Sequence, residues 1–338
     1  MNLISKSTLR RNNRITLESF LNGIKLPRGV NRVYQRFNNI KGVRYLPTRE
    51  TSNLIEVTVN GMGQSAPFFA PYAALTAEKG IETICLTLPG HFGDENISSL
   101  NFFSQLTIED YAEYVKRALI EIASQNPEKK LIVNGHSMGG QIVLSAITSL
   151  KEDENESETY KKIAGLIISS GAGTSFARIR HTIAMVLSVA AGLPSYLASL
   201  GKTFKIPNFV ARWSFFAGIN IKQFTDIARV FDLYKAEPGR VFMQLLRASF
   251  PSILGEIAYK PDLDIGNIPV LNVYAIIDPL VSAKTGLGLS TLLTRKGATV
   301  TTLGLMTRNH NYITVPEEAI ELVDEKINWL KTMPNIFS

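Results

Sequence analysis

The pentapeptide Gly135-His136-Ser137-Met138-Gly139 contains residue types whose spacing could perform chemistry. An apolar run at 131–133, followed by Asn134, precedes it and a second run at 142–144 follows it, so the sequence predicts a strand, a sharp turn and a helix in that order. A G-x-S-x-G turn in this setting is typical of a nucleophile elbow, which exposes a serine hydroxyl on a strained turn at the edge of a sheet. Ser137 is therefore the candidate nucleophile.

A serine nucleophile needs a base, and the chain has only four histidines. His136 adjoins Ser137, so its ring is expected to point away from the hydroxyl. His91 lies in the loop 88–93, and His181 falls within a helical insertion. His310 follows the last predicted strand, at the edge of the sheet where Ser137 also lies. We therefore predict His310 as the base by elimination.

The acid that orients such a histidine is expected after another strand at the same edge. Asp278 ends the predicted strand 270–277 and precedes Pro279, so the chain turns there and holds the carboxylate near the rim. The strand at 163–168 is followed by Ser-Ser-Gly-Ala-Gly, which contains no carboxylate. Asp278 is therefore the predicted acid.

The elements that must position these residues alternate between strands and helices. An amphipathic helix at 107–126 opens with a predicted Thr107 and Asp110 cap, and a second helix is predicted from Pro316 to about Leu330. This alternation predicts an α/β protein with a mostly parallel sheet and helices on both faces. Further strands are predicted at 30–37 and 42–46, which form a hairpin with its turn at 38–41, and at 53–60, 81–88, 163–168, 269–276 and 299–305.

With these motifs in this order, the chain resembles α/β-hydrolase fold enzymes of the lipase and esterase type, closest in pattern to those like monoacylglycerol lipase. The resemblance covers the chain from about Asn53 to its C-terminus. The order Ser137, Asp278, His310 is that of this fold rather than of other triad folds. The resemblance implies that these residues are nucleophile, acid and base.

The resemblance also implies an oxyanion hole made by two backbone N–H groups. Met138, directly after the serine, takes one position, and Met62, in the loop after the third strand, takes the other. Where relatives often carry His-Gly before this loop, the chain has Asn60-Gly61.

The activity implied is acyl transfer to Ser137 followed by hydrolysis. We expect a carboxylic ester hydrolase for an apolar small-molecule ester such as a monoglyceride or lysophospholipid. A thioesterase or acyltransferase with the same triad stays open, as does a hydrolase-fold protein that binds an apolar ligand without turnover. No metal or organic cofactor is expected, because the sequence has no Cys/His cluster, no H-E-x-x-H and no phosphate-binding loop.

The connection between the strands ending near 170 and starting at 269 is too long for an ordinary loop. In the resembled fold this place commonly carries a cap, so we predict a helical cap (lid) at 173–237 inserted into a core formed by 29–172 and 238–338. The cap is rich in aromatic residues, and some are expected to line an apolar pocket over Ser137. The candidates for substrate binding are Phe204, Trp213, Phe215 and Phe216.

One stretch of the cap, 181–201, contains no charged residue. About 20 apolar residues can span a bilayer, but Pro194 is expected to break this stretch into two short helices. Three interpretations are open: buried cap helices, which we favour, a lid face that touches lipid, or a membrane span.

The positive charge of the chain is local. Residues 1–50 carry eleven Lys or Arg against two Glu, whereas the whole chain has a net charge of +7. We predict a basic N-terminal arm at 1–28 that is solvated, contacts anionic membrane or targets an organelle; no nucleic-acid partner is expected. The lone Cys85 and the absence of an apolar signal segment favour a cytoplasmic protein, with peripheral membrane contact left open. The sequence does not indicate the oligomeric state.

Overall fold

The computed structural model describes residues 21–22, 24–49, 52–93, 100–171, 183–207, 210–211, 236–249, 263–306, 309–334 and 336. Its core is an eight-stranded sheet in the order β1-β2-β4-β3-β5-β6-β9-β10. The strands are β1 (Val30–Phe37), β2 (Ile40–Pro47), β3 (Leu54–Val59), β4 (Glu82–Thr87), β5 (Lys130–His136), β6 (Ile163–Ser169), β9 (Val270–Ala275) and β10 (Val300–Leu305). In this sheet β2 pairs antiparallel with both β1 and β4, and the other neighbouring strands pair parallel. The predicted mostly parallel sheet is therefore confirmed.

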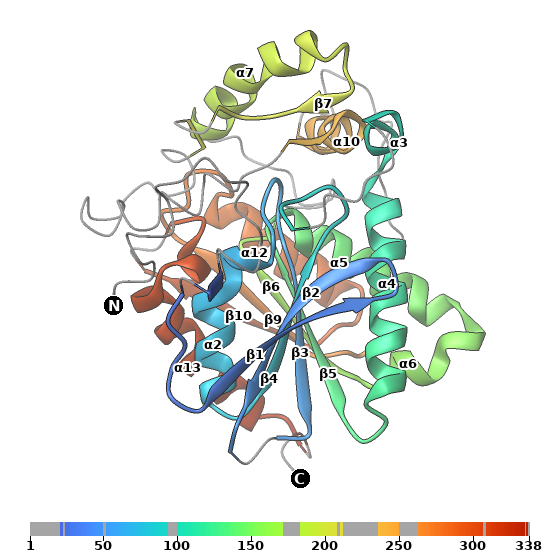
Figure 1. Ribbon diagram of the computed structural model, residues 1–338, viewed down its shortest axis with the longest axis vertical. Coiled ribbons are helices and arrows are strands. Elements are labelled where there is room, and N and C mark those ends of the chain that lie inside the picture. The colour runs from blue at the N-terminus through green and yellow to red at the C-terminus, as the bar shows by residue number, and fades with distance from the viewer. Residues whose placement is uncertain are drawn as a thin grey trace.

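Helices cover both faces of this sheet (Figure 1). The helices are α2 (Ala70–Glu78), α4 (Ile108–Gln125), α5 (Met138–Glu152), α6 (Ser157–Lys161), α12 (Ala283–Arg295) and α13 (Pro316–Lys331). Alternate residues of β5 belong to different hydrophobic clusters: Ile132 packs in the cluster with α2 and α13, and Leu131 and Val133 pack in the cluster with α4, α5 and α12. A strand buried on both faces is the arrangement expected in a parallel sheet.

Local sequence signals set several boundaries. The Thr107 side chain accepts from the Asp110 backbone and the Asp110 side chain accepts from the Thr107 backbone, so the predicted cap of α4 is confirmed. The hairpin turn is shorter than predicted, because Ile40 is buried and pairs with Phe37. Asn38, with φ of 52°, is in the left-handed conformation that asparagine tolerates, which permits the tighter turn.

Above the sheet in Figure 1 lie α3 (Leu100–Gln105), α7 (Ile183–Ala198), β7 (Thr203–Phe204), β8 (Glu237–Pro238) and α10 (Gly239–Ser249). The strands β7 and β8 pair with each other in a separate two-stranded sheet. Phe204 of β7 stacks on Phe242 of α10, with ring centroids 3.7 Å apart. The part of the chain packed over the sheet therefore includes residues beyond 237. Most of the predicted cap, residues 172–182, 208–209 and 212–235, lies outside the described residues.

The expected break at Pro194 is wrong, because α7 continues through it. Proline removes one backbone donor and crowds the carbonyl four residues earlier, that of Ala190. Both Pro194 and Ala190 are exposed, so water can bind the released carbonyl and the helix tolerates the loss. Among the helices in the described segments, none has the length and apolarity needed to cross a bilayer.

Most of the predicted arm, residues 1–20, lies outside the described residues. Its final part does not extend into solvent throughout, since Leu21 and Ile24 are buried in the hydrophobic core. Removing residues 1–28 would therefore take apolar side chains out of the core as well as charge.

Candidate active site

Ser137 lies in a strained turn between β5 and α5. Its φ of 55° and ψ of −123° fall outside the ordinary regions for a side-chain-bearing residue, as expected for a nucleophile elbow. Glycine is required on either side of this turn, because a Cβ at Gly139 would lie 2.3 Å from the Val59 carbonyl oxygen. A Cβ at Gly61 would lie 2.8 Å from the Ser137 Cβ. The turn and the loop after β3 are therefore in close contact.

The structure brings together Ser137, His310 and Asp278. The His310 Nε2 lies 2.9 Å from the Ser137 Oγ, and its Nδ1 lies 2.8 Å from the Asp278 Oδ2. The other carboxylate oxygen of Asp278 accepts from the backbone N–H groups of Leu280 and Val281 at 2.8 and 2.9 Å. All three side chains are buried, with Ser137 the most exposed at 9%.

This chain of hydrogen bonds suits proton transfer. Asp278, held by two backbone donors, can accept the Nδ1 proton of His310 and so favours the tautomer with a lone pair on Nε2. That lone pair faces the Ser137 hydroxyl and can take its proton. The three residues come from loops after β5, β9 and β10, whose carboxyl ends meet at one edge of the sheet.

The loop with the predicted oxyanion donor Met62 is a tight turn. The Gln64 N–H donates to the Gly61 carbonyl at 3.2 Å, and Gly63 has φ of +68° while Met62 does not have positive φ, which is a type II turn. Asn60 supports it, because its amide donates to the carbonyls of Gly61 and Gln64 at 3.0 and 2.9 Å. Thus an amide performs the supporting contacts where the resembled enzymes carry histidine.

The second predicted donor, Met138, is the first residue of α5. Its N–H belongs to a helix N-terminus, where unpaired backbone donors and the helix dipole favour negative charge. Met62 and Met138 thus flank the region of Ser137 from the turn at 61–64 and from the start of α5.

His136 has a contact that the sequence did not suggest. Its Nε2 lies 2.9 Å from the His310 carbonyl oxygen, and its Nδ1 lies 3.1 Å from the side-chain amide of Gln64. Burial, together with the nearby His310, lowers the pKa of His136 to about 3. The ring therefore remains neutral near pH 7, and it links the backbone of the predicted base to the turn at 61–64.

The described partner of the His91 Nε2 is Glu237 of β8. This nitrogen lies 2.8 Å from the Glu237 Oε1, and the Gly63 N–H donates to the same oxygen at 2.5 Å. Sequence reasoning missed Glu237 because it lies 174 residues from Gly63 in the chain, with no motif around it.

The candidates for substrate binding have mixed outcomes. Phe204 is buried between Gly192 of α7 and Phe242 of α10, so its described contacts are with the cap itself. Trp213, Phe215 and Phe216 lie outside the described residues. Those residues that the structure describes hold no cluster of three or more His, Cys, Asp or Glu side chains that could bind a metal ion.

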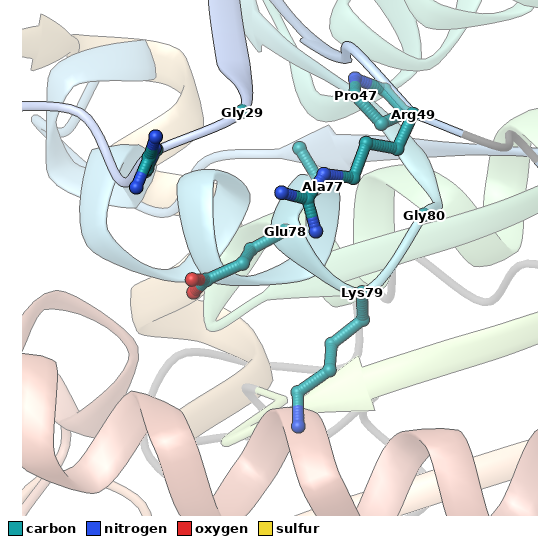
Figure 2. A pocket seen from close by; sticks show the side chains of 8 residues that line it. Gly29, Pro47, Arg49, Ala77, Glu78, Lys79 and Gly80 are labelled. Carbon is teal, nitrogen blue, oxygen red and sulfur yellow. The ribbon is translucent and has the colours of Figure 1, made fainter.

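A cleft of about 430 Å³ lies away from this site. Figure 2 shows it between Pro47 at the end of β2, Lys79 just after α2, and Arg49. Arg28 also lines it. Parallel strands begin at this edge and end at the edge that carries Ser137, so the cleft is at the opposite end of the sheet. Arg28, Arg49 and Lys79 are exposed, and Lys79 pairs with Asp324 at 2.8 Å.

Comparison with known proteins identifies the fold. Residues 57–286 match the family described as "Alpha/beta hydrolase family", and no curated protein matches the chain in sequence. The monoacylglycerol lipase of Paleococcus ferrophilus is similar with a TM-score of 0.59 and 16% identity, over 86% of this chain and 97% of that one. A putative lipase of Acinetobacter baumannii has a TM-score of 0.56 and 17% identity, over 90% and 91%.

The N-acyl homoserine lactonase AidH, in complex with N-butanoyl homoserine, has a TM-score of 0.59 and 15% identity, over 90% of this chain and 99% of that one. At such low identities these likenesses show the fold alone. With the family match, they confirm the α/β-hydrolase fold predicted from the sequence.

Proposed function

Since the chain belongs to the Alpha/beta hydrolase family, we propose that it is a serine hydrolase that cleaves a carboxylic ester with an apolar acyl group. The observation that carries this proposal is the pair of hydrogen bonds, 2.9 and 2.8 Å, that joins the Ser137 hydroxyl to His310 and His310 to Asp278. Serine is unreactive without a base, and this arrangement supplies the base and the group that orients it.

In the proposed reaction, the Ser137 Oγ attacks the ester carbonyl carbon while the His310 Nε2 takes the hydroxyl proton. The carbonyl oxygen becomes an oxyanion, which the N–H groups of Met62 and Met138 stabilise. The intermediate collapses, the ester C–O bond breaks and His310 gives its proton to the leaving alcohol. Water then attacks the acyl-enzyme with His310 again as base, which releases the acid and restores the Ser137 hydroxyl.

An apolar acyl group is proposed because α7, which lies above the sheet in Figure 1, is apolar in sequence. Among the α7 side chains that the structure describes, the exposed large ones are Leu187, Leu193 and Leu197, and no charged residue occurs in 181–201. The similar structures include proteins named as lipases and one lactonase bound to an acyl compound. Acyl-chain length and the alcohol part are left to experiment.

Peripheral contact with anionic membrane is a further part of the proposal. Leu187, Leu193, Leu197 and Leu200 are 44–88% exposed on α7 and just after it. An exposed apolar helix face can bury itself at the lipid interface, and a basic segment adds attraction to anionic lipid. The basic residues of 1–20 would supply that charge.

The test combines a covalent probe with a substrate series. A fluorophosphonate should label the protein once, at Ser137, and p-nitrophenyl esters from short to long acyl chains should be hydrolysed with a preference for apolar chains. Acyl thioesters and added alcohol acceptors measure the thioesterase and acyltransferase alternatives. Absence of both labelling and turnover would leave a protein that binds an apolar ligand without turnover and would refute the proposal.

A further inference from the structure

Glu237 connects the cap to the loop beside Ser137. It is the first residue of β8, which pairs with β7 of the cap, and its side chain is fully buried. Its Oε1 accepts from the Gly63 N–H and lies 2.8 Å from the His91 Nε2. A single carboxylate oxygen therefore holds the turn at 61–64 and the loop at 88–93 together.

The contact is an ion pair. The His91 Nδ1 lies 3.2 Å from the Leu88 carbonyl oxygen and its Nε2 faces the carboxylate, so both ring nitrogens face acceptors and both must donate. Burial lowers the pKa of His91, but the Glu237 carboxylate and the carbonyls of Leu88 and Pro89 together raise it, so that the pKa lies above its ordinary value. The hydroxyl of Tyr111 also faces Glu237 and donates to the Pro89 carbonyl.

The turn at 61–64 is otherwise held from the core. Gly61 donates to the Gln64 side chain at 3.0 Å, and the Asn60 amide binds two carbonyls of the turn. The N–H of Gly63 is the donor that is bound from the cap. Gly63 directly follows Met62, whose N–H must point at the oxyanion, so rotation of the Met62–Gly63 peptide would change the shape of the turn that aims this donor.

We propose that Glu237 is a positioning residue that locks the oxyanion turn from the cap, so that the oxyanion hole is complete only while β8 is docked on His91 and Gly63. This inference rests on the proposed serine hydrolase function. In this inference the cap supports the oxyanion hole during the chemical step, in addition to any contact that it makes with substrate. Displacement of the cap would lower kcat even for a substrate too small to touch it.

The experiment uses p-nitrophenyl acetate and full-length protein, with fluorophosphonate labelling of wild type as the prior condition. Glu237→Gln keeps an acceptor oxygen at the same reach, whereas Glu237→Asp keeps the charge but is about 1.5 Å shorter and cannot reach Gly63. We expect kcat within about 10-fold of wild type for Glu237→Gln and about 10²-fold lower for Glu237→Asp, with KM little changed in both, as for loss of one oxyanion donor.

The control is Glu82→Gln, because Glu82 is also a buried carboxylate in ion pairs, with Arg44 and Lys129, but lies where β4 begins, away from Ser137. It should lower thermal stability and leave kcat unchanged. A kcat order in which Glu237→Asp is faster than Glu237→Gln would mean that charge rather than reach matters, and would overturn the inference.

A double-mutant cycle tests the route of the effect. Met62→Pro removes the proposed donor, and proline is favoured at this second position of a type II turn, so the turn itself is retained. If Glu237 acts through that donor, Glu237→Asp should cost less than about 3-fold in the Met62→Pro background. If the fold-losses in kcat of the two single variants multiply in the double variant, the inference is refuted and the proposed hydrolase function stands. A wild type that is neither labelled nor active refutes the proposed function instead.

Discussion

Two buried polar clusters meet on β5 and differ in whether their hydrogen bonds leave an atom available for chemistry. The core cluster consists of Glu56, Tyr72, Thr76, Asn134 and Lys326, and the rim triad consists of Ser137, Asp278 and His310. In the core cluster the Lys326 ammonium has three acceptors, at 2.6, 3.0 and 2.7 Å. In the rim triad the Ser137 hydroxyl faces His310, the proposed base, and Ser137 is the most exposed of the three residues.

Asn134 of the core cluster connects it to the strand beside the rim triad. Its amide donates to Glu56 at 2.9 Å, and its oxygen accepts from the Ser169 hydroxyl at 3.2 Å. The Ser169 carbonyl in turn accepts from the Ser137 backbone N–H at 2.9 Å. The comparison teaches that the core cluster, whose polar atoms bind one another, anchors the strands, while the rim triad leaves the proposed nucleophile available. Substitutions should therefore separate stability from activity.

The largest effect on kcat is expected in the rim triad. Ser137→Ala should lower kcat by about 10⁶-fold and abolish fluorophosphonate labelling, because the nucleophile is lost. The free energy of unfolding should change by less than about 1 kcal/mol, since the hydroxyl makes few contacts. Ser149→Ala is the control for a lost hydroxyl, because Ser149 lies on α5, the helix that follows Ser137, and binds Lys116. Labelling that survives Ser137→Ala would contradict the assignment of the nucleophile.

The acid should come next. Asp278→Asn keeps the shape of the side chain but presents an amide to His310, so the wrong tautomer is favoured and kcat should fall by about 10⁴-fold. His310→Ala should be at least as slow, measured with the same p-nitrophenyl ester. Near-normal kcat for Asp278→Asn would mean that another residue orients His310.

Substitutions in the core cluster should lower stability and leave activity unchanged. Lys326→Ala leaves the buried Glu56 carboxylate without its charge partner, so urea unfolding should show a loss of about 3–5 kcal/mol, while kcat of the folded protein stays near wild type. The double variant Glu56→Gln and Lys326→Met removes both charges and should recover much of the stability. A large fall in kcat without loss of stability would show that the core cluster takes part in the chemistry.

The His91–Glu237 pair should make stability depend on pH. The pKa of His91 is raised in the folded protein, above about 6.5 in the unfolded chain. The stabilisation from this pair is therefore full below about pH 6.5 and is lost as pH rises through the raised pKa. Unfolding free energies between pH 6 and 9 should fall more steeply for wild type than for His91→Gln. Equal slopes would mean that this proton is not part of the cap contact.

The smallest effect is expected at the surface. Wild type should co-sediment with phosphatidylserine vesicles several-fold better than protein lacking residues 1–20, because each basic residue near the surface adds up to about 1 kcal/mol, and the difference should fade with salt. The truncation ends before Leu21 and Ile24, which belong to the core. The double variant Leu193→Ser and Leu197→Ser should lower the co-sedimentation that remains at high salt. Equal co-sedimentation of all three proteins would refute the proposed membrane contact.

Local sequence patterns predicted helices and strands well where a single cap or apolar run determined them. The cap of α4 at Thr107 and the apolar strands of the parallel sheet needed only neighbouring residues. Pro194 was misjudged because its local cost was weighed without the solvent around α7. The candidate triad could be chosen from sequence since its members follow strand ends, and carboxyl ends of parallel strands share an edge.

The sequence by itself determined the α/β class, the strained turn at Ser137 and the few histidines from which a base could be chosen, because these depend on short-range periodicity, glycine positions and composition. Only the tertiary structure decided that His136 holds the His310 backbone, that Lys326 reaches Glu56 across 270 residues and that Glu237 of the cap binds Gly63. Such partners are set by how distant elements pack, and the cost of leaving a buried polar group unpaired selects them only once the chain is folded.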